Sequence, residues 1–327
     1  MKSKNTIVLL IIIFIIIFVI FNIFLLTELV FNKEKLEKLQ EIYDPQINPK
    51  DFVSGINNKY LIFIPGTTFV YEGKTEDGIE RTEVYTTNNK KNIMGINTIS
   101  VWDRVWLDDE LIEDTKDYFA QDKYGNVWYF GEDSKELVNG KIASTKGSWQ
   151  AGVNGAQPGI VMKANPQAGD IYRQEYYKGE AEDMAEVVSL GVKIKIAYGS
   201  FSDCIQTRDW NPLEPSSDEY KYYCPEIAGL VYEVGVKDGK GTQLINVVTG
   251  PSQTEQDIGD EPKALKAGIT EQEAIAIAKS AVEGIVIDVG IEKKYGKASY
   301  VVEIDADGTE TDVILDVETG NVLGIET

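Results

Sequence analysis

The region from Leu61 to about Val248 alternates apolar and polar residues with a period of two, and turn dipeptides interrupt the alternation at short intervals. Side chains two apart on a strand point to the same face, so this pattern is typical of antiparallel strands that bury one face. The pair Asn139-Gly140 is a strong hairpin signal within the region. We therefore expect residues 60–249 to form one large, curved antiparallel sheet or incomplete barrel.

Some elements of this β-rich region can be placed individually. The pair Asp77-Gly78 is expected to form a turn that leads into a strand. The loop from Gln150 to Ala168 is rich in glycine and proline and is expected to be the most irregular part of the region. The clearest expected strands are Arg81 to Thr87, Thr98 to Leu107, Leu111 to Gln121 and Asn126 to Phe130.

The end of the chain has a different pattern and is expected to form a small α+β domain over residues 269–327, after a linker over residues 250–268. Thr270 and Glu273 have the spacing of a capping box, which predicts a helix from this point. One helix against a small antiparallel sheet makes a two-layer αβββ module. The expected strands are Ala298 to Ile304, Thr311 to Asp316 and Asn321 to Ile325.

This last module resembles a PepSY domain. The resemblance rests on the segments Thr270–Ala278, Tyr300–Val302 and Asp316–Leu323, taken in that order and spacing. It implies an extracytoplasmic, non-catalytic domain of a kind often attached to secreted peptidases or anchored in membranes, for which inhibition of peptidases or control of the local protease environment is proposed. The family supplies no catalytic residue to this chain.

The central region resembles an uncharacterised group of secreted or membrane-anchored β-rich proteins, with a curved sheet of the lipoprotein-carrier (LolA-like) half-barrel kind. That resemblance implies an architecture and no assigned activity. Cys224 departs from it, because a small residue is expected there. The segments that carry the resemblance are Pro65–Tyr71, Asp122–Phe130, Tyr198–Cys204 and Tyr222–Val231.

The run from Ile7 to Leu26 contains no charge and only one polar residue, Asn22. Its length is enough for one helix across a bilayer core of about 30 Å, whereas the apolar core of a cleaved signal peptide has about 7–15 residues. Lysines precede the run and mixed charges follow it, which favours a cytoplasmic N-terminus. We therefore expect a signal anchor over residues 7–26, with residues 1–6 in the cytoplasm, a stalk and tether over residues 27–59, and the rest of the chain outside the cell membrane. Cleavage of the run as a signal peptide is the alternative.

The chain contains no histidine, which excludes nucleophiles activated by histidine and zinc sites with histidine ligands. Its two cysteines are too few for a four-cysteine metal site. We expect no cofactor and no metal. The formal charge of −21 repels phosphate backbones, so nucleic acid is not an expected partner.

Cys204 and Cys224 lie on the side of the membrane that is expected to be oxidising, and a disulfide between them is the expected state. Two buried thiols or a redox-active pair are the alternatives. The redox alternative is weaker because the two cysteines do not have Cys-x-x-Cys spacing.

Large aromatic side chains and acidic residues supply the candidate sites. Trp102, Trp106, Trp128 and Phe130 fall on adjacent expected strands and are candidates to line a concave face that binds an acyl chain, an apolar peptide or a sugar. The alternative is that they form the core of the sheet. The acidic run Glu180–Asp183 is interpreted as a solvated turn rather than as a cation site.

These observations predict a membrane-anchored, extracytoplasmic, non-catalytic binding protein whose PepSY-like domain engages a secreted or envelope peptidase or another protein. The second hypothesis is a carrier or sensor of a lipid or carbohydrate, bound in the β-rich region. The third is a divergent hydrolase that uses carboxylates, because a catalytic carboxylate pair need not be adjacent in sequence.

Overall fold

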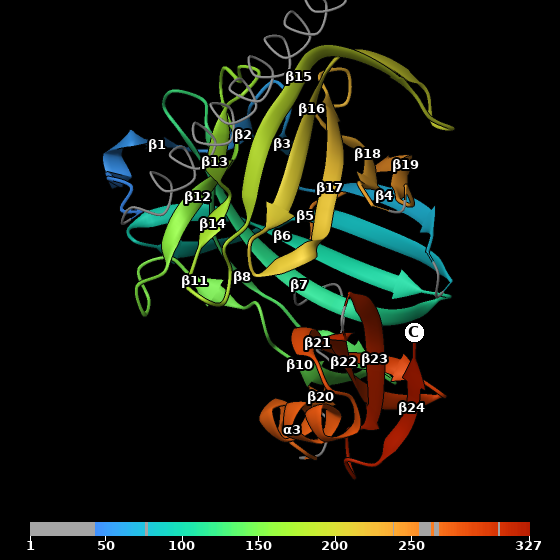
Figure 1. The fold of residues 1–327 in the computed structure, drawn as a ribbon. Coiled ribbons are helices and arrows are strands. Elements are labelled where there is room, and N and C mark those ends of the chain that lie inside the picture. Colours follow the sequence, from blue (N-terminus) through green and yellow to red (C-terminus); the bar gives the residue numbers. More distant parts are fainter. Residues whose placement is uncertain (1–42, 76–77, 238, 255–262, 265–267, 307) are drawn as a thin grey trace, which may run out of the picture. The chain divides into compact units, whose positions relative to one another are not determined.

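The structure is a computed structural model that describes residues 43–75, 78–237, 239–254, 263–264, 268–306 and 308–327. The expected membrane span Ile7–Leu26 lies outside the described residues, as does most of the expected linker 250–268. Among the described residues, no helix is both long enough and apolar enough to cross a membrane. The described chain is mainly β, with one large sheet and a separate four-stranded sheet (Figure 1).

The β-rich region begins with a short 3-10 turn, η1 (Pro49–Asp51), and continues through twenty strands. In chain order these are β1 (Phe52–Val53), β2 (Ile56–Asn57), β3 (Ile62–Phe63), β4 (Thr67–Lys74), β5 (Ile79–Ile93), β6 (Ile96–Leu107), β7 (Glu110–Asp122), β8 (Val127–Asp133), β9 (Glu136–Val138), β10 (Lys141–Ser144), β11 (Trp149–Gln150), β12 (Gln157–Met162), β13 (Ile171–Arg173), β14 (Glu175–Tyr176), β15 (Met184–Lys195), β16 (Ser200–Asn211), β17 (Glu214–Cys224), β18 (Gly229–Gly235), β19 (Thr242–Thr249) and β20 (Lys263–Ala264).

Two antiparallel meanders make up most of the large sheet. Strands β4 to β8 pair in chain order, and so do strands β15 to β19. β12 pairs with β8, and β13 pairs with β15. β19 runs along β4, from Thr242 opposite Gly73 to Thr249 opposite Thr67. The prediction of one large, curved antiparallel sheet is therefore confirmed, and the sheet is nearly closed (Figure 1).

The local signals in the sequence match the strand positions well. The four clearest predicted strands correspond to β5, β6, β7 and β8, most of which extend beyond the predicted limits. Asn139 (φ 52°) and Gly140 (φ 70°) form the turn of the β9–β10 hairpin. Positive φ at both central positions is what a two-residue turn of type I′ requires. One difference lies before Tyr60, where η1, β1 and β2 occupy part of the expected tether and Ile56 is buried in the core.

Side chains alternate between the two faces of the sheet. On β6, Val101 belongs to an apolar cluster with Phe63 and Phe119, whereas its neighbour Trp102 is not part of that cluster. A second cluster, around Phe130 and Trp149, packs on other strands. The period of two thus separates an inner face from an outer face, as the alternation in the sequence predicts.

The separate four-stranded sheet belongs to the C-terminal region. It follows helix α3 (Glu271–Ala281) and consists of β21 (Ile285–Lys294), β22 (Lys297–Ala306), β23 (Thr309–Asp316) and β24 (Val322–Glu326), paired antiparallel in chain order. The predicted αβββ module is therefore corrected to one helix and four strands. β21 escaped prediction because Gly290 and a register shift between Val286 and Asp288 interrupt its alternation.

Helix α3 begins where its capping residues predict. The amide of Glu273 donates to Thr270 Oγ1 (3.2 Å), and the amide of Thr270 donates to Glu273 Oε2 (2.8 Å). The fully buried side chains of Ala274 and Ala278 then contact the apolar face of the sheet, which includes Leu315. The capping box is confirmed.

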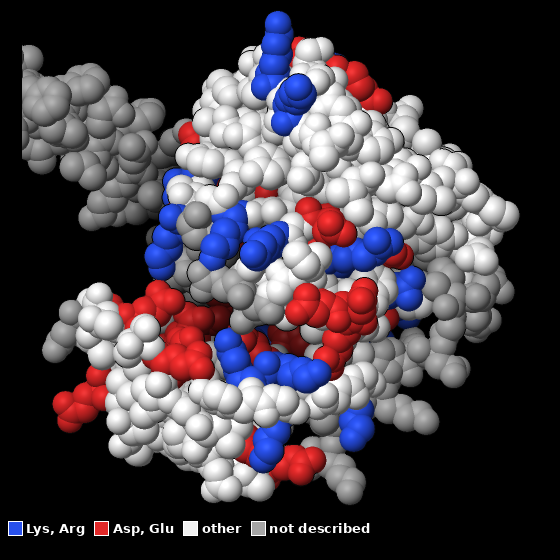
Figure 2. Space-filling view, turned by 90° about the vertical axis from the view of Figure 1, so that its right-hand side faces the viewer, with Lys and Arg blue, Asp and Glu red and all other residues white. Residues whose placement is uncertain are grey.

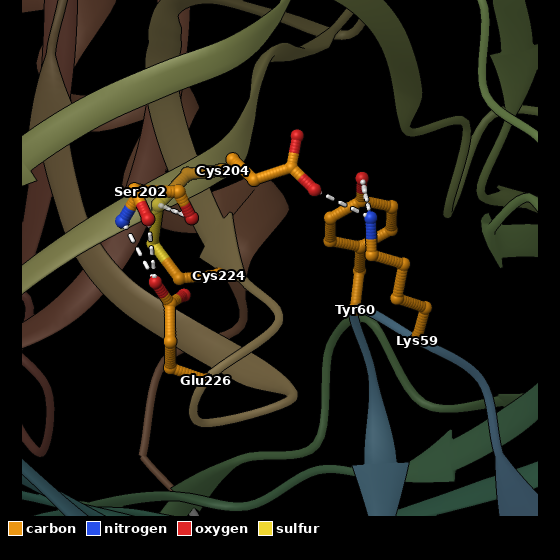
Figure 3. Close-up of a disulfide and its surroundings, with 7 residues drawn as sticks. Lys59, Tyr60, Ser202, Cys204, Cys224 and Glu226 are labelled. Atoms are coloured by element: carbon orange, nitrogen blue, oxygen red, sulfur yellow. Dashed lines mark hydrogen bonds and ion pairs between the residues drawn. A yellow bond between two sulfur atoms is a disulfide. The ribbon is translucent and has the colours of Figure 1, made fainter.

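Cys204 on β16 and Cys224 on β17 form the expected disulfide (Figure 3). Both side chains are fully buried among apolar neighbours that include Leu244. Beside the disulfide, the amide and hydroxyl of Ser202 donate to Glu226 Oε1 (2.9 and 3.0 Å). The bond therefore joins two paired strands at a fixed point of the sheet.

Candidate functional site

The interior of the large sheet contains a cavity of about 260 Å³, called here the central cavity. A second cavity of about 280 Å³, the side cavity, shares five lining residues with it. The shared residues are Tyr71, Val84, Asp103, Lys221 and Leu230. Taken together, the two cavities reach the size of small-molecule sites, which are roughly 300–1,000 Å³.

The strands place alternate side chains in the central cavity. Phe69 and Tyr71 come from β4, and Asp117 and Phe119 come from β7. Residues two apart share a face, so each of these strands contributes an apolar and a polar group to the same wall. The apolar and aromatic part of the lining is Leu61, Ile62, Phe63, Phe69, Val84, Phe119, Val161 and Leu230, with the tyrosines Tyr71, Tyr129 and Tyr223.

Carboxyl groups are the second component of the lining. Among the described residues that line the two cavities, eight are acidic and one, Lys221, is basic. Asp and Glu side chains also gather beside Lys and Arg across the face of the molecule drawn in Figure 2. The acidic residues of the two linings are Glu80, Asp103, Glu113, Asp117, Glu175, Asp183, Asp209 and Glu233.

Lys221 contacts several carboxylates. Its Nζ lies 3.1 Å from Glu233 Oε2, 3.5 Å from Glu219 Oε2 and 4.0 Å from Asp209 Oδ2. Burial acts to lower the pKa of Lys221, but these three carboxylates together raise it well above its usual value. Lys221 therefore stays protonated, and its ammonium group already forms ion pairs with these three carboxylates.

Tyr129 connects two carboxyl groups at one wall. Its Oη lies 2.5 Å from Asp117 Oδ1 and 2.9 Å from Glu132 Oε2. A phenol has one proton to donate, so both contacts are favourable only when one of the two carboxyls is itself protonated. Burial raises the pKa of Asp117 to about 7 and that of Glu132 to about 8. The Asp117–Tyr129–Glu132 group therefore holds a proton at neutral pH.

Other carboxyl oxygens at the central cavity have no partner. Within the described part of the chain, Oδ1 of Asp103, of Asp183 and of Asp209 is buried without a hydrogen bond. Burial raises the pKa of all three groups, to about 6 for Asp183. Glu175 differs, because Trp149 Nε1 donates to its Oε2 (2.6 Å). These three oxygens are enclosed by protein next to the cavity.

The four predicted aromatic residues lie elsewhere, since none of them is among the residues that line the central cavity. Trp102 is buried and donates to Asp114 Oδ1 (3.0 Å), and the guanidinium of Arg104 stacks on both Trp102 and Trp106. Trp128 donates to Asp122 Oδ2 (3.0 Å). Phe130 is fully buried in a core cluster with Trp128 packed against it. Their binding of a ligand stays a prediction.

Sequence reasoning missed the acidic residues of the cavity, although a signal was present. Asp103 lies between Val101 and Val105, so a carboxyl occupies an inward position of an otherwise apolar face. Asp117 likewise stands two residues before Phe119. Asp183 was interpreted as part of a solvated turn, whereas the structure places it at the cavity wall.

Metal binding has no support from the geometry. Among the described residues, no group of three or more acidic or cysteine side chains is placed to hold a metal ion. The carboxyls of the cavity are therefore spread over its walls rather than gathered around one point.

Comparison with known proteins identifies the C-terminal region. Residues 268–326 match the PepSY family, described as the peptidase propeptide and YPEB domain. The predicted PepSY domain is therefore confirmed, and PepSY domains are non-catalytic, propeptide-like domains. The resemblance of the central region to LolA-like half-barrels stays a prediction.

The curated relative is itself uncharacterised. The uncharacterized protein YkoJ of Bacillus subtilis (strain 168) is 39% identical to this chain over 70 residues, which are 21% of this chain and 41% of that protein. The match thus spans less than half the length of that relative. No solved structure matches the chain.

Proposed function

We propose that this chain is a non-catalytic, extracytoplasmic binding protein whose PepSY domain binds a peptidase or another envelope protein. The observation that carries the proposal is the PepSY match over residues 268–326, on a region that has its own helix, four strands and apolar core. PepSY domains are associated with peptidases, so a peptidase is the first partner to test.

The test is capture of partners from native envelope. The bait is the full chain in detergent, and the control is a chain that ends at Thr254, which keeps β19 and removes the PepSY domain. We expect a peptidase or another envelope protein to be retained by the full chain and lost with the PepSY domain. Equal retention by both chains would refute a partner-binding role for this domain. Circular dichroism of the shorter chain checks that its sheet is intact.

A second function is supported by the central cavity: we propose that the β-rich region binds a small molecule there. Its volume and its aromatic lining are the properties of a binding site rather than of a filled core. Native mass spectrometry of the purified full chain, followed by extraction, would detect the molecule. Val84→Phe adds a ring where the two cavities meet and should abolish its retention, whereas Glu72→Gln on the exposed face of β4 should not.

We also propose that residues 7–26 anchor the protein in the cell membrane, with the described residues outside. The disulfide supports this location, because disulfides persist in oxidising compartments. Protease added to intact cells should digest the β-rich region, and carbonate washing should leave the chain in the membrane fraction. Release of the chain by carbonate would refute the anchor.

The hydrolase hypothesis is the weaker alternative. Asp117 at the central cavity and Glu132 beside Tyr129 have raised pKa values, which a general acid requires. The Asp117 and Glu132 carboxyls, however, both hydrogen bond to Tyr129 rather than flank a free space from opposite sides. We therefore favour binding over hydrolysis.

A further inference from the structure

One edge of the four-stranded sheet in the PepSY domain is free. β24 pairs with β23, and no other strand of the described chain pairs with β24 (Figure 1). A strand directs the N–H and C=O groups of alternate residues to its two sides, so a strand with one partner leaves a row of these groups unpaired at its outer edge. Another extended chain can pair with that row by adding as a further strand. The outer edge of β24 is therefore a candidate binding surface.

Ile325 presents its backbone to this edge. The amide of Asp316 on β23 donates to the carbonyl of Asn321 (2.9 Å), just before β24 begins. Groups that point from β23 toward β24 recur at every second residue, which includes Asp312, and Asp312 lies opposite Glu326. Glu326 therefore directs its backbone toward β23, and its neighbour Ile325 directs its N–H and C=O toward the free edge.

The side of β24 that faces the helix layer is apolar and partly exposed. Val322 lies opposite Leu315, and Ile325 lies opposite Val313. Leu315 and Val313 belong to the core that packs against α3, and residues directly opposite each other share a face of the sheet. Val322 and Ile325 are nevertheless 43% and 49% exposed. An added strand would bury both side chains beside apolar side chains of its own.

The opposite side of the sheet is acidic up to the free edge. Four carboxyl groups, one on each strand, stand opposite one another in register, at Asp288, Glu303, Asp312 and Glu326. Like charges directly opposite destabilise a sheet, and burial, together with the neighbouring carboxylates, raises the pKa of Glu303 to about 7. Lys294 lies near this row but already forms an ion pair with Glu292 (3.2 Å). The row ends at Glu326, so an added strand would supply its next position, where a basic side chain is favoured.

Tyr295 adds an aromatic ring to the acidic side of the edge. Its Oη donates to Glu326 Oε1 (2.8 Å), and the residue is 61% exposed. A Cβ built on Gly324 would lie 3.0 Å from Cζ of Tyr295, so the glycine leaves room for the ring across β24. An aromatic face attracts a cation, and a carboxylate accepts strong hydrogen bonds from Lys or Arg. The Tyr295 ring and the Glu326 carboxylate therefore suit a basic side chain.

We infer that the free edge of β24 binds an extended segment of the partner protein as an added strand, with Lys or Arg beside Glu326 and Tyr295 and an apolar residue beside Ile325. The inference rests on the proposed partner-binding function of the PepSY domain and adds the kind of segment that the domain binds. The acidic row favours a basic segment over a second copy of this chain, which would bring its own acidic β24 to the same edge.

Isothermal titration of the full chain in detergent tests the inference with three peptides. The lysine peptide, acetyl-Thr-Lys-Val-Lys-Val-Thr-amide, alternates basic and apolar side chains. The glutamate peptide has glutamate at both lysine positions. The methylated peptide keeps the lysines but carries N-methyl groups on its two central residues, so that one methyl group faces β24 whichever edge of the peptide pairs. We expect the lysine peptide to bind at least about tenfold more tightly than either of the others.

Two substitutions at one residue locate the binding. Ile325→Pro removes the N–H that faces the free edge and places the proline ring there, while the backbone groups that face β23 are unchanged. We expect it to weaken binding of the lysine peptide at least about tenfold. Ile325→Val keeps the N–H and is the matched control, which should alter the affinity less than about twofold.

A substitution of the charge gives a measurement that leaves the backbone intact. Glu326→Gln removes the carboxylate at the end of the acidic row, and should reduce the preference for the lysine peptide over the glutamate peptide. Circular dichroism and thermal unfolding of each variant confirm that it is folded. An unchanged preference in Glu326→Gln would overturn the assignment of the basic side chain to this edge.

Partner capture with the same variants separates this inference from the function on which it rests. A partner that Ile325→Val retains and Ile325→Pro loses would support the inference. Equal retention by Ile325→Pro and the unmodified chain would overturn it and leave the partner-binding function intact. If no captured protein depends on the PepSY domain and the lysine peptide does not bind, both fail. A dimer of the full chain that Ile325→Pro dissociates would also overturn the inference, because a second copy would then occupy the edge.

Discussion

The PepSY domain and the large sheet bury different kinds of side chain. The PepSY core is made of alanine, valine, isoleucine and leucine with one tyrosine, packed between α3 and the sheet. The interior of the large sheet places carboxyls beside its apolar residues and leaves a cavity between them. The PepSY core is closely packed, whereas the large sheet leaves a cavity beside buried carboxyl groups. That difference is the reason we propose small-molecule binding for the large sheet and not for the PepSY domain.

The comparison predicts opposite responses to substitution. Leu315→Ala removes a fully buried side chain from the PepSY core and should lower the free energy of unfolding by roughly 2–5 kcal/mol, because it leaves a cavity. Asp209→Asn in the large sheet should cost little or raise stability, since it removes a buried charge. Urea unfolding of both variants measures the contrast. Similar losses in the two variants would break the comparison.

The disulfide is expected to have the next largest effect, and on the large sheet alone. Replacing Cys204 and Cys224 together by alanine opens a loop with a sequence separation of 20 residues. We expect a loss of about 3 kcal/mol in the free energy of unfolding, from the chain-entropy model of loop closure. Hydrogen exchange would assign the loss to β16 and β17, with protection in the PepSY domain unchanged. Loss of protection in both regions would show that they unfold as one unit.

Acidity should stabilise the large sheet. Burial raises the pKa of Asp117 to about 7 and of Glu132 to about 8, whereas carboxyls of the unfolded chain titrate near 4. Between about pH 4 and pH 8 the folded chain therefore binds more protons, and the free energy of unfolding falls as the pH rises. We expect a Tm a few degrees higher at about pH 5.5 than at pH 8, and a smaller difference in Asp117→Asn.

The PepSY domain contains a group with the opposite behaviour. A hydrogen bond from Lys297, assisted by Thr319, lowers the pKa of Asp316 to about 2. Its contribution to stability is present above about pH 4 and is lost only as the pH falls toward 2. It therefore does not offset the effect expected between pH 5.5 and pH 8. A Tm that increased with pH in that interval would contradict the raised pKa values of Asp117 and Glu132.

The smallest expected effect lies at the start of α3. Thr270→Ala removes the hydroxyl that accepts from the amide of Glu273, and should lower the free energy of unfolding of the PepSY domain by about 1 kcal/mol. Thr270→Ser retains the hydroxyl and is the matched control. Partner capture should survive both changes if the folded domain is what binds.

The fold was predictable where local chemistry determines it. The alternation of apolar and polar residues predicted the strands β5 to β8, and Asn139-Gly140 predicted a hairpin. The capping residues Thr270 and Glu273 predicted the start of α3. β21 was missed because a bulge breaks its period of two. Closure of the sheet by β19 and β4 was not predictable in detail, since no local pattern specifies which distant strands pair.

The candidate site was less predictable than the fold. Periodicity identified Trp102, Trp106, Trp128 and Phe130 as residues of one sheet, but a large residue on a strand can point to either face. The carboxyls of the cavity come from several strands and from the segment around Asp183, and only the folded sheet brings them together. The available signal was an acidic residue at a position where the alternation predicts an apolar one, such as Asp103 between Val101 and Val105.

The pairing of β4 with β19 also sets the order in which this protein can be completed. β4 ends at Lys74, and its partner begins only at Thr242. During synthesis and export, β4 must wait with one edge unpaired until nearly the whole β-rich region is available to fold. An exposed edge of this kind can recruit a strand from another chain. Newly made protein is therefore most exposed to aggregation during this interval, and a chain terminated before β19 would remain in that state.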